Sequence, residues 1–207
     1  ADYNGDGVVD LKSEYVFAHA YYASSFDKGG KTSYMEDITR AFLDGRKLIT
    51  SANGEKLSDA QRSELMGYVD IISSNWEKVI AESVFKYAGS TYKSLVALEN
   101  VSNADLSKEF GKYMKYWGEL KGFSMALQVG KDNIGESATK LNRMIGFGPI
   151  LMDETQIIGI DSKGNYIMDK IYSMNDAKLH MLKIQKLMID EFGVEAKSND
   201  MLADMAD

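Results

Sequence analysis

The chain has 207 residues, enough for one globular domain with a sizeable core. Hydrophobic residues make up 44% of it and charged residues 27%, a composition that argues against a disordered chain. Its net charge of −7 disfavours a nucleic-acid partner, and its lack of cysteine excludes disulfides and thiolate zinc sites. A single proline favours long helices, and no apolar run is long enough to span a membrane.

The first predicted feature, within residues 2–14, is a calcium-binding loop of the EF-hand type. Oxygen-bearing side chains occupy its first, third, fifth and ninth positions, and Gly7 occupies the sixth, where the chain must turn sharply. Calcium needs six to eight hard oxygen ligands, and alternate residues of a tightly curled loop point inward. Position seven would add a backbone carbonyl. The predicted ligands are Asp2, Asn4, Asp6, Val8, Asp10 and Glu14.

This loop differs from a paired EF-hand in two ways. Ser13 stands at the twelfth position, so that the acid Glu14 comes one residue late, and no helix is expected before Asp2. The pattern is similar to the loop and exit helix of dockerins, and the alternative interpretation is an ordinary turn with incidental acids. We predict that Ca²⁺ stabilises the start of the following helix at millimolar extracellular concentrations. That preference favours an exported location.

Helix signals begin directly after the loop. A helix rich in aromatic residues and alanine is predicted over 11–26. Capping-box sequences at Ser33 and Ser58 predict the starts of two more helices, and Asn53-Gly54 predicts the end of the first of these two. The second continues past Gly89, either as one kinked helix or as two helices in series.

The C-terminal half is predicted to contain further helices and one hairpin. Asn103 and Asn175 are the expected caps of two helices, and a short helix is expected over 137–145. Between them, residues 155–171 break the helical period and predict a small β-hairpin around Gly164. We expect a single helical domain over 11–196 and a polar tail over 197–207.

Apolar side chains recur every three or four residues in three of these segments, which is typical of bundled helices. We expect these three seams to be buried, and the fold class is therefore predicted to be all-α, a helical bundle with one small hairpin. The seams are Met35, Ile38, Phe42 and Ile49; Leu65, Val69, Ile72, Trp76, Ile80 and Tyr87; and Phe110, Tyr113, Trp117, Leu120, Phe123 and Leu127.

No residue meets the standard for a catalytic assignment. His19 and His180 both lack the neighbours of a His-Glu-x-x-His metal motif, and no serine lies in a Gly-x-Ser-x-Gly elbow. The acidic pairs Asp153-Glu154 and Asp190-Glu191 consist of sequence neighbours, which point in different directions on a helix. We interpret both pairs as solvated surface.

Three stretches resemble an uncharacterised bacterial family allied to the imelysins. They are Ala-Phe-Leu-Asp-Gly-Arg-Lys-Leu-Ile over 41–49, Asn-Trp-Glu-Lys-Val-Ile-Ala over 75–81, and Tyr-Trp-Gly-Glu-Leu-Lys-Gly-Phe-Ser-Met-Ala-Leu-Gln over 116–128. All lie within 36–130, roughly half of the chain. They match the C-terminal half of that family, so the resemblance implies a further N-terminal half outside this chain. It also implies an all-α bundle of the imelysin-like kind.

The resemblance further implies an extracytoplasmic location (periplasm, cell surface or secreted) and an association with metal or iron acquisition. The imelysin His-x-x-Glu motif is absent, because His19 is followed at the third position by Tyr22 and His180 by Lys183. We therefore transfer no peptidase residue.

Three functional hypotheses follow from the sequence. The first is a non-catalytic helical protein, stabilised by calcium, that binds a ligand or partner at the cell envelope. The second is an imelysin-like metal-dependent hydrolase. The third is an interaction subunit that completes a bundle with another chain or with the missing half.

Overall fold

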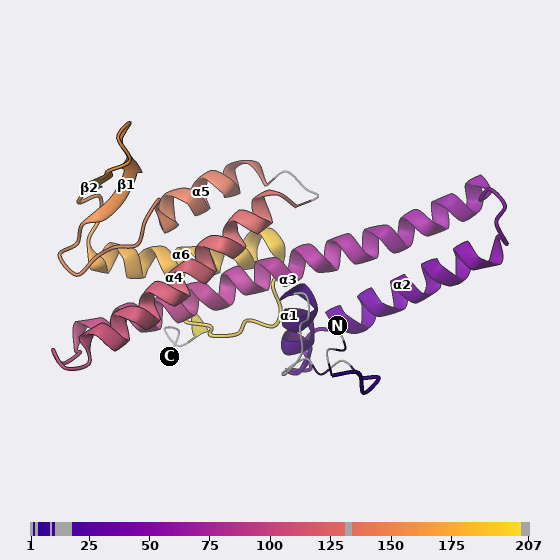
Figure 1. The fold of residues 1–207 in the computed structure, drawn as a ribbon, viewed down its shortest axis with the longest axis horizontal. Coiled ribbons are helices and arrows are strands. Elements are labelled where there is room, and N and C mark those ends of the chain that lie inside the picture. The colour runs from indigo at the N-terminus through magenta and orange to yellow at the C-terminus, as the bar shows by residue number, and fades with distance from the viewer. Residues whose placement is uncertain (1, 3, 9, 11–17, 131–133, 204–207) are drawn as a thin grey trace. The chain divides into compact units, whose positions relative to one another are not determined.

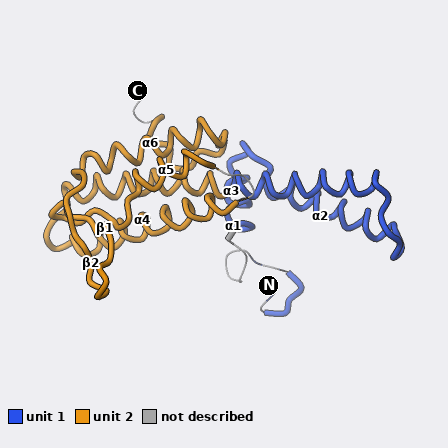
Figure 2. The backbone as a smooth tube through the Cα atoms, turned by 90° about the horizontal axis from the view of Figure 1, so that it is seen from above, with its two compact units in different colours: residues 1–79 blue, residues 80–207 orange. Residues whose placement is uncertain are grey.

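The computed structural model describes residues 2, 4–8, 10, 18–130 and 134–203 (Figure 1). The chain divides into two compact units, residues 1–79 and residues 80–207, which Figure 2 colours separately. Apart from one small antiparallel sheet, the secondary structure of the described residues is helical, which confirms the predicted fold class. None of the described helices combines the length and the apolar composition that a membrane span requires.

Unit 1 contains α1 (Ala18–Asp27), α2 (Tyr34–Ser51) and the first part of α3 (Asp59–Glu99). The predicted helix over 11–26 is thus seen from Ala18 onward, and residues 11–17 lie outside the described residues. The predicted end of α2 is confirmed, because the chain turns at Asn53 (φ 48°) and Gly54 (φ 86°).

The N-terminus of α2 is capped differently from the prediction. Ser33 makes no side-chain cap bond and instead donates its hydroxyl to Asp37 at 2.6 Å. The carboxylate of Asp27 accepts the backbone N–H groups of Tyr34 at 2.9 Å and Met35 at 2.7 Å. An acid from the end of α1 therefore satisfies the first donors of α2, which a pattern confined to residues 33–36 does not reveal.

α3 runs without interruption from Asp59 to Glu99, which settles the choice left open at Gly89 in favour of one helix. Its predicted capping box is confirmed. The backbone N–H of Ser58 donates to the side-chain oxygen of Gln61 at 2.9 Å, and the Gln61 N–H donates to the Ser58 hydroxyl at 3.3 Å.

Unit 2 contains the rest of α3 together with α4 (Leu106–Gln128), α5 (Gly135–Ile145) and α6 (Met174–Phe192). The two predicted asparagine caps are wrong by two residues each. α4 has Asp105 as its N-cap in place of Asn103, and α6 has Ser173 in place of Asn175. Ser173 forms a full capping box with Asp176, a reciprocal pair that outcompetes a lone asparagine.

The predicted hairpin is confirmed as β1 (Gln156–Ile160) paired antiparallel with β2 (Tyr166–Asp169). The buried side chain of Gln156 fixes its base, donating to the Tyr172 carbonyl at 3.1 Å and accepting the Ile171 N–H at 2.9 Å. The hairpin is thereby joined to the segment that leads into α6.

The residues after α6 are bound to the helices as far as Met201. Glu82 of α3 is fully buried, and its carboxylate accepts the N–H groups of Glu195 at 2.5 Å, Ala196 at 2.6 Å and Lys197 at 3.1 Å. Gln185 of α6 accepts the Met201 N–H at 2.9 Å, and the Met201 side chain is itself buried. The expected polar tail is thus bound to unit 2 over 197–201, and 204–207 lie outside the described residues.

The core of unit 2 contains the predicted seam of α4, with Tyr113, Leu120 and Leu127 fully or almost fully buried. The predicted seams of unit 1 are only partly buried. Ile38 is 3% exposed, whereas Phe42 is 55%, Ile49 is 54% and Val69 is 43% exposed. For these three residues the expectation of burial is wrong, because in unit 1 α2 and α3 leave one side of their seam open.

Candidate functional site

The N-terminal loop is curled around its own oxygen side chains. The Asp2 carboxylate accepts the N–H groups of Gly5 at 2.8 Å and Gly7 at 2.9 Å. Asp6 accepts the Val8 N–H at 2.8 Å, and the Asn4 amide oxygen accepts the Asp6 N–H at 2.9 Å. Gly5 (φ 75°) and Gly7 (φ 84°) supply the left-handed backbone that this curl requires.

The oxygen atoms of this loop are ligands of the kind that hard divalent cations prefer. Asp2, Asn4, Asp6, Val8 and Asp10 are all exposed, so that binding an ion would require no buried charge. Each carboxylate has about four lone-pair sites, and the N–H groups accepted by Asp2 occupy two of them. Oxygen lone pairs therefore remain for a metal.

The structure brings only part of the predicted ligand set together. Asn4 donates its amide to Asp6 at 3.0 Å, which places these two side chains side by side. Within the described residues, no three His, Cys, Asp or Glu side chains converge closely enough to hold a metal. The predicted ligand Glu14 lies outside those residues.

Each histidine packs against an aromatic ring. The ring centroids of His19 and Trp76 are 5.1 Å apart in unit 1, and those of His180 and Tyr172 are 4.9 Å apart in unit 2. Burial lowers the pKa of His19. The pKa of His180 is also lowered, first by burial and then by the positive charge of Lys183. The charge of Asp176 and a hydrogen bond to the Met144 backbone act in the opposite direction but do not reverse the shift. For both imidazoles the net effect therefore favours the neutral form.

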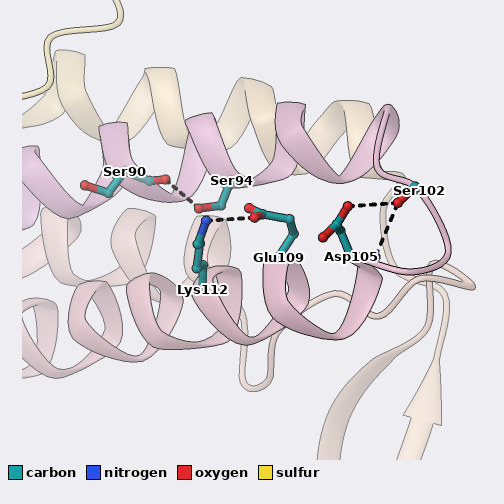
Figure 3. A network of polar contacts seen from close by, with 6 residues as sticks. All are labelled: Ser90, Ser94, Ser102, Asp105, Glu109 and Lys112. Atoms are coloured by element: carbon teal, nitrogen blue, oxygen red, sulfur yellow. Dashed lines mark hydrogen bonds and ion pairs between the residues drawn. The ribbon is translucent and has the colours of Figure 1, made fainter.

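A polar cleft of about 300 Å³ lies between α3 and α4. Figure 3 shows the side chains of Ser90, Ser94 and Glu109, which line it, with their polar contacts. Its serine hydroxyls bond to their own helix, since Ser90 donates to the Lys86 carbonyl and Ser94 to the Ser90 carbonyl, each at 3.1 Å. On the facing helix, Glu109 pairs with Lys112 at 2.7 Å. Neither histidine lines this cleft, so no serine–histidine pair forms there among the described residues.

The open side of the unit 1 seam is a groove of about 430 Å³ between α2 and α3. Its lining includes the exposed side chains of Phe42, Ile49 and Val69. Its floor is formed at Gly45, where the missing side chain lets Leu65 and Tyr68 approach the α2 backbone. Sequence periodicity finds these residues but assigns them to the core. We call Phe42, Ile49 and Val69 with Leu65 and Ile72 the open seam.

Comparison of the chain with protein families, with curated proteins and with solved structures found no match.

Proposed function

We propose that this chain is an exported, non-catalytic helical protein of the cell envelope that binds a ligand or partner and is stabilised by calcium at its N-terminal loop. The observation that carries the proposal is the alternating run of oxygen donors in a loop curled at Gly5 and Gly7. The extracytoplasmic location and a link to metal or iron acquisition rest on the resemblance to the imelysin-allied family.

The ion would be held by the side chains of Asp2, Asn4, Asp6 and Asp10 and by the backbone carbonyl of Val8. Glu14 would supply the acidic ligand that a usual EF-hand loop has one residue earlier. Calcium would supply charge neutralisation and crosslinking of the loop rather than chemistry. Because the ligands among the described residues, Asp2 to Asp10, are exposed and the twelfth loop position is Ser13, we expect weak binding, with a dissociation constant of about 10⁻⁴ to 10⁻³ M, as in extracellular modules.

Calcium is expected to stabilise the chain, and Asp6→Asn is expected to abolish the effect. Asparagine keeps an oxygen for the Val8 N–H but removes the negative charge that the ion needs. At calcium tenfold above its dissociation constant, the free energy of unfolding should rise by about 1.4 kcal/mol. Thermal unfolding in calcium and in EDTA, with isothermal titration calorimetry, measures the effect.

The matched control is Asp59→Asn, which removes one exposed carboxylate of unit 1 outside the loop. It should keep the full calcium effect. Identical unfolding of the wild type in calcium and in EDTA, with no calorimetric heat of binding, would overturn the proposal.

A second candidate function is an interaction subunit, favoured by the open seam of unit 1. The side chains of Phe42, Ile49 and Val69 are each more than 40% exposed and lie on the facing sides of two helices. Exposed apolar side chains grouped in this way are typical of a surface that another protein element covers. Two antiparallel helices with one open seam form half of a four-helix bundle. A second copy of this chain can complete such a bundle without another protein. Its own α2 and the first part of α3 would cover the open seam, with the two copies related by a two-fold axis.

Val69→Asp is expected to abolish this self-association, because it places an unpaired charge at the centre of the joint core. The wild type should sediment as a dimer at micromolar concentrations, and Val69→Asp as a monomer with unchanged helicity. Leu179→Asp, at an exposed leucine of α6, is the control and should remain dimeric. A wild type that sediments as a monomer at all concentrations up to about 100 μM would contradict this candidate.

A further inference from the structure

A second groove, of about 410 Å³, lies between α5 and α6 in unit 2. Its long sides are cationic. Lys140 and Arg143 line it from α5, and Lys183 and Lys186 line it from α6. The spacing of three residues within each pair places both members on one face of their helix. Four cations thus surround one concavity on a chain whose net charge is −7.

Among the described residues, three of these cations lack a carboxylate partner. No carboxylate in that part of the chain forms an ion pair with Lys140, Arg143 or Lys183, and no hydrogen bond there uses their side chains. Lys186 pairs with Asp190 at 2.9 Å, and Asp190 is the one carboxylate of the described residues that lines the groove. Asp176 also acts on Lys183 through its charge.

The base of the groove is apolar and firmly held. Leu187 is 8% exposed, and Met144 is half-buried beside it. α5 is fixed against α4, because Trp117 donates to the Ile145 carbonyl at 3.1 Å and Lys121 to the Gly146 carbonyl at 2.6 Å. A concave site with an apolar base and charged groups along its sides is a usual arrangement for a small charged ligand.

We propose that the α5–α6 groove binds a small molecule that carries two or more anionic oxygen groups. The cations come in two pairs on opposite sides, so that one ligand can meet Lys140 and Arg143 with one group and Lys183 and Lys186 with another. Arginine adds the planar pair of donors that matches carboxylate and phosphate oxygens. The shared chemistry is that of a diphosphate or a polycarboxylate, and the volume suits a ligand of that size.

The test is isothermal titration calorimetry of the full chain with pyrophosphate and, separately, with citrate. We expect saturable binding of at least one, with a dissociation constant below about 1 mM that weakens about tenfold between 50 and 500 mM sodium chloride. Binding of pyrophosphate alone would indicate a phosphate ligand, and binding of citrate alone would indicate a carboxylate ligand. Binding of both would indicate that the groove selects its ligand by negative charge and not by the type of anionic group. Each of these results supports the proposal.

The double variant K140Q/K183Q removes one cation from each side of the groove and should weaken binding about tenfold or more. Its control, K108Q/K163Q, removes two exposed lysines of unit 2 that lie outside the groove, and should bind like the wild type. Circular dichroism checks that both variants fold. The ring resonances of His180, which lines the groove, should shift on titration in the wild type. No saturable binding of either probe, or equal weakening by the two double variants, would overturn the proposal.

Discussion

Glu82→Gln is expected to lower the free energy of unfolding by about 2–3 kcal/mol and to release the segment that follows α6. The wild-type carboxylate is fully buried and accepts three consecutive backbone N–H groups, those of residues 195–197. Glutamine has nearly the same shape but turns one of the two acceptors into a donor. An N–H group that loses its acceptor where the backbone is partly buried is left unsatisfied.

Urea unfolding measures the loss of stability, and hydrogen exchange at the amides of Glu195, Ala196 and Lys197 shows where it acts. These amides should exchange faster in the variant. Glu191→Gln is the matched control, since it makes the same chemical change at an exposed position on α6. A loss for Glu82→Gln no larger than for Glu191→Gln would show that the carboxylate does not hold the segment.

The local part of the fold could be predicted from the sequence, and the long-range part could not. The Ser58 capping box, the turn at Asn53-Gly54 and the hairpin around Gly164 depend on residues a few positions apart, and the structure confirms them. The cap of α2 comes from Asp27, seven and eight residues before its partners. The bond between Glu82 and Ala196 spans 114 residues. No period or motif in a single sequence indicates such a pairing.

The candidate sites also differ in how far the sequence predicts them. A pattern within fourteen residues predicts the calcium loop, and it stays a prediction because no finding tests it. The periodicity that picks out Phe42 and Val69 predicts an apolar face but does not say whether that face is buried within the chain or exposed. The α5–α6 groove is not among the features predicted from the sequence. Its cations lie on two helices separated by the hairpin, and the available signal was the spacing of three within each pair.

Gly89→Ala is expected to be the most destabilising single-methyl change in unit 2, at about 3 kcal/mol. A Cβ added at Gly89 would lie 2.0 Å from the backbone oxygen of Asn199 and 2.7 Å from the Gln185 amide nitrogen. The first of these atoms is main chain and cannot rotate away. To admit the methyl group, the segment around Asn199 must move off α3, which breaks the bond from Gln185 to the Asn199 carbonyl at 2.7 Å.

Gly118→Ala supplies a control with the opposite sign. Gly118 is an exposed glycine of α4, and a Cβ added there would meet no heavy atom within 4 Å, so alanine should gain about 0.5–1 kcal/mol of helix propensity. Propensity alone predicts the same gain at Gly89, which lies inside α3. The difference between the two variants in urea unfolding therefore isolates the contact with the C-terminal segment. If both alanines stabilise the protein, that segment does not pack on α3 in solution.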